Sequence, residues 1–162
     1  MVEADVRHRS NVTVTGDADG PVVVLAHGFG CDQSMWRLVV PRLAGRYKVV
    51  LFDYVGSGRS DPSAWVPERY ASLDGYAQDV VDVLRALDLR RVTFVGHSVS
   101  AMAGVLAART APERIGSLVM VSPPRATSTT TGTAAASHRP TSRNCWPRWT
   151  RTTSAGRPRW HR

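Results

Sequence analysis

The residues 91–104, Arg-Val-Thr-Phe-Val-Gly-His-Ser-Val-Ser-Ala-Met-Ala-Gly, decide the fold class of this 162-residue chain. Their apolar start predicts a strand over 91–95, and the small residues that follow predict a helix over 99–109. Gly96-His97-Ser98-Val99-Ser100 stands between the two. A serine at such a sharp strand-to-helix turn has an exposed hydroxyl beside the positive end of the helix dipole. The motif therefore predicts that Ser98 is a nucleophile, although it ends in serine rather than the usual glycine; a chance serine at an ordinary junction is the alternative.

The rest of residues 1–125 alternates between strand and helix patterns. The run 21–26 is continuously apolar, which is typical of a strand buried on both faces of a sheet. Strands are predicted at 11–15, 21–26, 47–52, 91–95 and 115–121, and helices at 73–89, 99–109 and 34–43, the last with Ser34 as its N-cap and Gly45 at its end. This order predicts an α/β fold with a mostly parallel sheet and helices on both faces.

A second motif, His27-Gly28-Phe29-Gly30, directly follows the strand predicted at 21–26. A loop at this place can aim the backbone N–H of Phe29 at a developing oxyanion, with the N–H of Val99 as its partner. The glycines allow the backbone to approach the reacting carbon closely. The alternative is that His27 is only a turn residue. Because both loops occur in the order that such a site requires, we predict an oxyanion hole, with the side chains of Phe29 and His97 contacting the substrate.

The loop 53–60, Asp-Tyr-Val-Gly-Ser-Gly-Arg-Ser, is predicted to be a tight structural loop at the rim of the site. Asp53 is not counted as the catalytic acid, because in this kind of site the acid follows the nucleophile and the histidine follows the acid. After the nucleophile the chain contains one acid, Glu113, and two histidines, His138 and His161. None of them stands at a predicted strand end near the serine. We therefore expect that the triad acid and base are absent from this chain and that its activity is weak or absent.

Charge divides the chain near residue 125. Residues 1–125 contain 14 of the 21 Lys and Arg and all 13 Asp and Glu, so this part is nearly neutral. Residues 126–162 contain nine Thr, four Ser, seven Arg and three Trp, but no Leu, Ile, Val, Phe or Met. Without aliphatic residues this tail has no face to bury against a sheet. The predicted organisation is a partial α/β core at 1–125 and a basic tail at 126–162 that is disordered or out of frame.

Composition also limits the partners and the location. Nearly all of the net charge of +8 belongs to the tail, so we do not expect nucleic-acid binding by the folded part. Binding of RNA or DNA by the Arg- and Trp-containing tail is the least favoured alternative, because a shifted frame explains the same residues. No apolar run approaches the roughly 18 residues that a membrane span needs, and the polar N-terminus does not resemble a signal peptide. Cys31 and Cys145 form neither a CxxC pair nor a metal-binding spacing. These observations predict a cytoplasmic protein without a metal site.

Three stretches of the chain resemble the α/β-hydrolases of the RsbQ type, bacterial stress-response regulators whose plant relatives are the karrikin and strigolactone receptors. They are 27–34 (His-Gly-Phe-Gly-Cys-Asp-Gln-Ser), 68–77 (Glu-Arg-Tyr-Ala-Ser-Leu-Asp-Gly-Tyr-Ala) and 96–102 (Gly-His-Ser-Val-Ser-Ala-Met). Ser100 is a normal variant in this branch. The resemblance covers about residues 8–125 and implies a Ser–Asp–His hydrolase with a helical lid over a small apolar pocket and no cofactor. The implied ligand is a small hydrophobic ester or lactone.

Beyond Pro124 the resemblance ends. When the third base of each tail codon is taken as the first base of the next, with wobble bases chosen freely, residues 127–161 read differently. They then give an acidic Gly-Gly-Phe segment, an amphipathic helix, Asn-Tyr and Trp-Ala, which resemble the lid region of the family. We therefore expect a frameshift near residues 124–126, with the C-terminal strands and the lid missing. Three functions stay open: a serine hydrolase, a ligand sensor that binds a regulatory protein, and a non-functional fragment.

Overall fold

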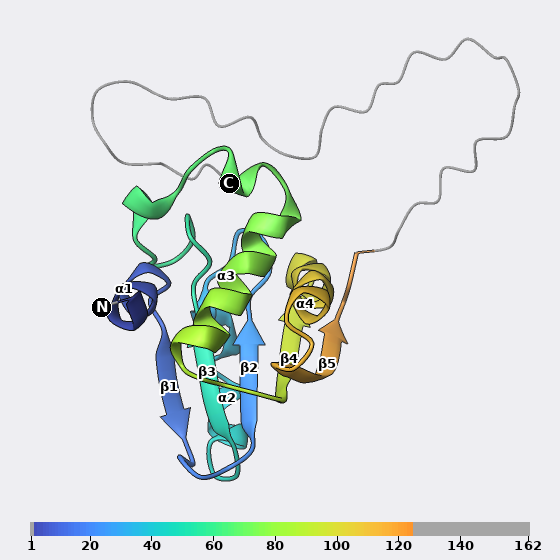
Figure 1. Cartoon of the computed structure of the whole chain (residues 1–162). Helices are drawn as coiled ribbons and strands as arrows, with labels where there is room; N and C mark the ends of the chain where they lie inside the picture. Colours follow the sequence, from blue (N-terminus) through green and yellow to red (C-terminus); the bar gives the residue numbers. More distant parts are fainter. Residues whose placement is uncertain (1, 125–162) are drawn as a thin grey trace, which may run out of the picture. The chain divides into compact units, whose positions relative to one another are not determined.

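A five-stranded sheet forms the centre of residues 2–124, which are the residues that the computed structural model describes, with side chains from residue 5 onward (Figure 1). The predicted tail at 126–162 lies outside these residues. The strands are β1 (Thr13–Gly16), β2 (Val22–Ala26), β3 (Lys48–Phe52), β4 (Val92–His97) and β5 (Ile115–Val121). Their order is β1-β3-β2-β4-β5, and every pair is parallel except β1 with β3. This confirms the predicted α/β class with a mostly parallel sheet.

Helices connect the strands and cover the sheet. They are α1 (Val2–Arg9), α2 (Val40–Leu43), α3 (Leu73–Ala86) and α4 (Val99–Thr110), with short 3-10 helices η1 (Gln33–Trp36), η2 (Pro62–Ala64) and η3 (Arg69–Ala71). Helix α3 starts where the sequence predicts but ends before Leu89, because Asp88 has a left-handed backbone with φ 45°. Within residues 2–124, no helix is both long enough and apolar enough to span a bilayer.

The single helix predicted over 34–43 is wrong. The structure has η1 and α2 instead, and the cap of η1 is Asp32, whose carboxylate accepts a hydrogen bond from the Ser34 backbone N–H at 2.7 Å. Pro41 explains the break, because proline has no N–H and its ring blocks a helix that arrives from the preceding turn. Proline is tolerated in a first helical turn, and Pro41 occupies that place in α2. Helix α1 was not predicted at all.

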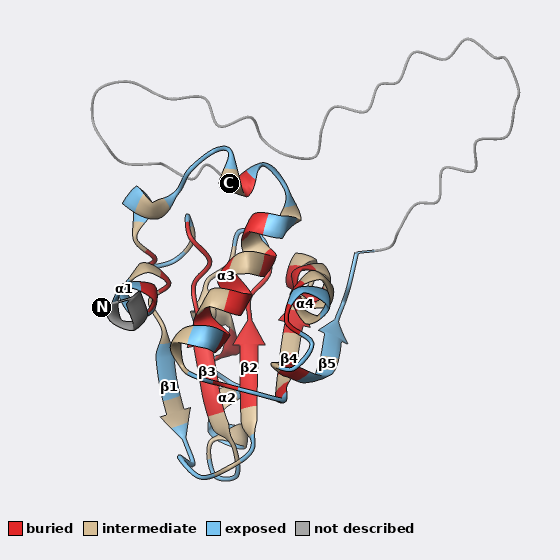
Figure 2. Ribbon diagram, in the orientation of Figure 1, coloured by how far each residue is buried: buried red, intermediate tan, exposed pale blue. Residues whose placement is uncertain are grey.

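Two apolar clusters lie on opposite faces of the sheet, which confirms the prediction of helices on both faces. On one face, β2, β3 and β4 pack against α3 and α4, with residues such as Phe52, Phe94 and Leu84 at most 1% exposed. On the other face, Trp36 of η1 packs on the alternate side chains of β2 and β3. Figure 2 shows the result: β2 and β3 are buried along most of their length, whereas β5 is exposed.

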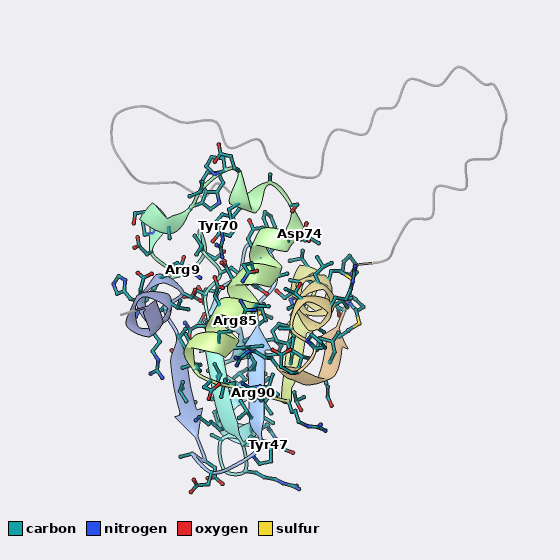
Figure 3. All side chains as sticks on the ribbon, in the orientation of Figure 1. Arg9, Tyr47, Tyr70, Asp74, Arg85 and Arg90 are labelled. Carbon is teal, nitrogen blue, oxygen red and sulfur yellow. The ribbon has the colours of Figure 1, made fainter. Side chains whose placement is uncertain are left out.

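A buried ionic cluster joins α1, η3 and α3, and we call it the Asp79 cluster. It consists of Asp79, Asp82, Arg9, Arg69 and Tyr70; Figure 3 labels Arg9 and Tyr70 beside α3. Arg69 donates to Asp79 at 2.7 Å and to Asp82 at 3.0 Å, and Arg9 donates to Asp82 at 2.9 Å. The Tyr70 hydroxyl donates to Asp79, whose side chain is fully buried. The cluster fixes the N-terminal helix and the 65–72 segment to the side of α3.

The order of the strands reverses at β2, which has β3 on one side and β4 on the other. The chain passes from β2 outward to β3 and then returns across β2 to form β4. In open parallel sheets the loops after two such strands separate, and the crevice between them is the usual place for a ligand. Here those loops begin at His27 and Ser98, so the fold brings the two motifs of the sequence to one edge of the sheet.

Candidate active site

Ser98 lies at the turn between β4 and α4 with φ 55° and ψ −122°, a strained backbone for a residue with a Cβ. Its backbone N–H donates to the Val121 carbonyl of β5 at 2.8 Å, and its carbonyl accepts from Ala101 in the first turn of α4. Gly96 makes the turn possible: a Cβ there would lie 2.5 Å from the Ser100 carbonyl oxygen. Strand β4 ends at His97, two residues beyond the predicted end at 95, and leads directly into the turn.

The loop after β2 lies against this turn. A Cβ placed on Gly28 would lie 2.5 Å from His97 Nδ1 and 3.4 Å from the Ser98 Cβ, so only glycine allows the two loops to approach this closely. Phe29, the next residue, has 55% of its side chain exposed. The structure thus brings together the Gly28–Phe29 backbone and the Ser98 turn, which the sequence predicts as the two halves of an oxyanion hole.

His97, a predicted substrate contact, has its ring beside Gly28. Its Nδ1 is buried and has no hydrogen-bond partner among the residues that the structure describes. A buried ring nitrogen without a partner is uncommon, because most buried polar atoms are hydrogen-bonded. The role of His97 in substrate binding stays a prediction, and this nitrogen is the atom through which it would act.

His27 is more than a turn residue, because its buried ring joins two loops. Its Nε2 accepts a hydrogen bond from the Tyr54 backbone N–H at 3.2 Å, and its Nδ1 lies 2.9 Å from the Gly28 carbonyl oxygen. The two contacts are satisfied together by the neutral ring with its proton on Nδ1. The Tyr54 ring packs edge-on against His27. Burial lowers the pKa of His27, against the opposing effects of the Gly28 hydrogen bond and the nearby aspartates.

Asp53 is a structural residue of the rim. Its carboxylate accepts hydrogen bonds from Asn11 Nδ2 at 2.7 Å, from the Gln33 N–H at 2.8 Å and from the Arg59 N–H at 2.9 Å. Gly58 leaves the space that this carboxylate fills. Asn11 and Gln33 were not singled out in the sequence. These two residues meet Asp53 because three separate loops lie at the same edge of the sheet. No local sequence pattern could have indicated this contact.

Glu113 lies at the opposite edge from Ser98. It lies two residues before β5, and β5 starts beside Val92 at the start of β4, so parallel pairing places Glu113 at the amino end of the strands. Its carboxylate lies 3.6 Å from Arg114 Nε. That Glu113 is not the catalytic acid stays a prediction. His138 and His161 lie outside the described residues.

The neutral state of His27 predicts a dependence of stability on pH. Burial lowers the pKa of His27 in the folded chain. Just below pH 6.5, the ordinary pKa of histidine, the unfolded chain therefore binds a proton on this ring, whereas the folded chain does not. The stability that His27 contributes is thus present above pH 6.5 and is lost as the pH falls from 6.5 toward the lower folded-state pKa. We expect the free energy of unfolding in urea to fall between pH 7 and 5, with a slope of up to about 1.4 kcal/mol per pH unit from this residue.

Two variants separate this effect from other titrating groups. His27→Gln is expected to flatten that part of the pH profile, whereas His8→Gln, which alters an exposed histidine of α1, is expected to keep it. Equal slopes in wild type and His27→Gln would show that the ring is protonated as readily in the folded chain as in the unfolded one.

The backbone of Ser98 predicts a second difference. Glycine adopts a positive φ without a clash, whereas alanine keeps the Cβ that makes φ 55° unfavourable. Both variants lack the hydroxyl, so their comparison isolates the strain. We expect Ser98→Gly to be about 1 kcal/mol more stable to urea than Ser98→Ala, after the greater chain entropy of glycine offsets part of the gain. Equal stability of the two variants would show that the strain at position 98 is no larger than the entropic cost of glycine.

Comparison with known proteins supports this reading of the fold. Residues 21–162 match the alpha/beta hydrolase fold family. A karrikin insensitive 2 receptor of Petunia hybrida is 46% identical over 117 residues, which are 72% of this chain and 43% of the receptor. Strigolactone esterase D14 of Arabidopsis thaliana is 38% identical over 121 residues, 75% of this chain and 45% of the esterase.

Among solved structures, a hydrolase from Oleispira antarctica superposes with a TM-score of 0.73 and 46% identity, over 75% of this chain and 44% of the hydrolase. The chain therefore spans less than half the length of these relatives. The family match extends over most of the chain and includes both the loop at Gly28 and the turn at Ser98. This chain belongs to the alpha/beta hydrolase fold family.

Proposed function

We propose that the chain carries the nucleophile and the oxyanion hole of a serine hydrolase of the RsbQ type, for a small hydrophobic ester or lactone. Ser98 is the nucleophile, and the backbone N–H groups of Phe29 and Val99 are the oxyanion donors. The observation that carries the proposal is the turn itself, a serine at φ 55° between a strand and a helix with Gly28 packed against it. The relative named strigolactone esterase supports the class of substrate.

The chemistry follows from these positions. In a complete enzyme, whose triad base accepts the hydroxyl proton, attack of the Ser98 Oγ on an ester carbonyl carbon gives a tetrahedral intermediate with negative charge on the former carbonyl oxygen. The Val99 N–H belongs to the first turn of α4, where helix N–H groups have no partner within the helix and the dipole favours negative charge. The Phe29 N–H comes from the facing loop. One such donor typically contributes about 10²–10³ in kcat.

The triad acid and base are absent from this chain in our proposal, so the hydrolase activity of the chain as it stands is weak or absent. Within residues 2–124, two groups near the site are already engaged, Asp53 by three donors and His27 by the Tyr54 N–H. Glu113 is at the far edge of the sheet. Without a base the serine hydroxyl is a weak nucleophile at neutral pH.

The tail supports a shifted reading frame as the cause. Residues 127–161, read one base out of frame, resemble the acidic segment and lid helix of the RsbQ type. Sequencing of the locus is expected to find a gained or lost base near codons 124–126. A clean read of the present frame in several isolates would exclude a sequencing error.

A fluorophosphonate probe tests the catalytic assignment. A chain with the frame restored after Pro124 is expected to be labelled on Ser98, as located by peptide mass spectrometry, and to lose the label in Ser98→Ala. Ser117→Ala, which alters an exposed serine of β5, is the matched control and is expected to label like wild type. The chain as it stands is expected to label far more slowly.

Two results would contradict the proposal. Labelling of the restored chain that persists in Ser98→Ala would show that another residue is the nucleophile. Fast labelling of the present chain that depends on Ser98 would show that it contains a working base.

A ligand receptor that binds a regulatory protein is the second candidate, favoured by the receptor from Petunia hybrida. A receptor needs the pocket but not the turnover of its ligand. In the restored chain, this function predicts ligand-dependent retention of the partner by both wild type and Ser98→Ala. A pure hydrolase predicts no retained partner in either.

A further inference from the structure

Ser100 differs from the glycine that usually ends the nucleophile motif, and the structure gives its hydroxyl a contact. Ser100 lies in the first turn of α4 and is fully buried. Its Oγ donates a hydrogen bond to the backbone carbonyl of His27, which is 73 residues earlier in the chain. The bond therefore connects the helix of the nucleophile directly to the loop that carries the Phe29 N–H.

The His27 carbonyl lies just beyond the end of a hydrogen-bonded ladder. The pairing of β2 with β4 ends at Ala26 and Gly96. The Ser98 N–H, the next donor along the turn, is directed to Val121 on the other side. Outside the helices and ladders, the backbone hydrogen bonds of residues 2–124 include no donor to this carbonyl. A buried carbonyl needs a partner, and the Ser100 hydroxyl supplies it.

The bond acts on the peptide plane directly before the one that carries the Phe29 N–H. The His27 carbonyl belongs to the peptide between His27 and Gly28, so a donor on this oxygen restricts rotation of that peptide plane. One residue later, the His97 ring packs against Gly28. The Gly28 carbonyl, which shares its peptide plane with the Phe29 N–H, lies 2.9 Å from His27 Nδ1 and accepts a hydrogen bond from the Cys31 N–H at 3.2 Å. Ser100 anchors the preceding plane, and glycine or alanine at position 100 would remove that anchor.

We propose that Ser100 is a positioning residue of the oxyanion hole, which orients the Phe29 N–H by donating to the His27 carbonyl. The proposal rests on the function proposed above, because it assigns Ser100 to the same site. It concerns the hydroxyl alone, since alanine retains the Cβ and hence almost all of the packing of this buried side chain. A role in packing and a role in positioning therefore predict different results for Ser100→Ala.

The sequence permits a direct spectroscopic test on the full chain. The dipeptide His-Gly occurs once, at His27-Gly28, and Gly-Phe occurs once, at Gly28-Phe29. Labelling with 1-¹³C-histidine and ¹⁵N-glycine gives one cross-peak that reports the His27 carbonyl. Labelling with 1-¹³C-glycine and ¹⁵N-phenylalanine gives one that reports the Phe29 N–H. Both are measured in wild type and in variants whose ¹⁵N spectra show a folded chain.

In Ser100→Ala we expect the His27 carbonyl carbon to shift upfield, as a carbonyl does when it loses a donor, and the Phe29 amide resonance to move with it. Ser100→Thr keeps the hydroxyl and is expected to restore both toward wild type. Ser10→Ala is the matched control, because Ser10 is equally buried and its hydroxyl has no partner among the described residues. It is expected to leave both resonances in place.

The proposal is overturned if both resonances stay at their wild-type positions in Ser100→Ala, or if they move equally in Ser10→Ala. A result in which the carbonyl shifts and the Phe29 amide does not would also overturn it, since the bond would then not orient the donor. These outcomes do not depend on whether Ser98 is the nucleophile. Failure of the labelling experiment with fluorophosphonate is therefore distinguishable from failure of this proposal.

Discussion

Gly96→Ala is expected to lower the free energy of unfolding by about 3 kcal/mol, because the added methyl group collides with backbone rather than with a movable side chain. A Cβ on Gly96 would lie 2.5 Å from the Ser100 carbonyl oxygen and 2.6 Å from the Ala101 nitrogen. Both atoms belong to the first turn of α4, which can yield only if the helix moves away from β4. The same movement would displace the Val99 N–H, so the variant would damage the site as well as the fold.

A matched substitution gives the scale for this effect. Gly45→Ala adds the same methyl group where no atom lies within 4 Å and where φ is not positive. It is expected to leave stability unchanged or to raise it by up to about 1 kcal/mol, since alanine has less freedom in the unfolded chain. Urea unfolding followed by circular dichroism measures both variants. A Gly96→Ala chain within about 0.5 kcal/mol of Gly45→Ala would show that α4 does not pack tightly on β4.

The sequence predicted the strands and the turn at Ser98 because the causes are local. Each buried strand has its own apolar run, and β5 has the bounds that the pattern 115–121 indicates. At the turn, Gly96 and the small residues around the serine are themselves the requirement for its shape. Gly28 was also predictable, since a loop that closely approaches a substrate favours glycine, although its contact with His97 was not.

The errors arise where two local signals compete or where the cause is distant. The pattern predicts the N-cap at Ser34, whereas the cap in the structure is Asp32, a residue type equally suited to that position. Pro41 could have indicated that a helix over 34–43 is interrupted. Helix α1 shows no apolar stripe. It is held by Val6 in the core and by Arg9 on Asp82, and neither contact is visible before the fold is known.

The Asp79 cluster is the largest feature of the fold that the sequence did not indicate. On the helical pattern of α3, Asp79 and Asp82 read as polar residues between apolar ones, which is typical of a solvent-exposed face. In the structure the Asp79 side chain is fully buried. The cations that make this possible come from α1 and from η3, so the burial depends on contacts between separate elements.

Arg69→Gln is therefore expected to destabilise the chain by about 2 kcal/mol at pH 7. Removal of one partner from a buried ion pair typically costs about 3–5 kcal/mol, because a buried charge is left behind. Arg69 has 34% of its side chain exposed and Arg9 remains 3.7 Å from Asp79, so solvent and the second cation reduce the loss. Arg90→Gln, which alters an arginine 62% exposed beside Asp88, is the matched control and is expected to change stability by less than about 0.5 kcal/mol.

The dependence on pH identifies the charge responsible. Burial raises the pKa of Asp79, while Arg69, Arg9 and Tyr70 lower it, so the loss of Arg69 raises this pKa further. A carboxyl whose folded-state pKa is raised destabilises the chain above that pKa and ceases to do so as the pH falls below it, where it is protonated. The deficit of Arg69→Gln in urea unfolding is thus expected to shrink from pH 7 toward pH 4.

The double variant Arg69→Gln/Asp79→Asn tests whether the charge of Asp79 causes the loss of stability in Arg69→Gln. It removes the buried charge together with its partner, and a buried pair replaced as a whole is often close to neutral. We expect the double variant to recover most of the stability lost in Arg69→Gln at pH 7. If instead the two losses add, Asp79 contributes through its hydrogen bonds with Tyr70 and not through its charge, and the cluster would be a polar network that happens to be ionised.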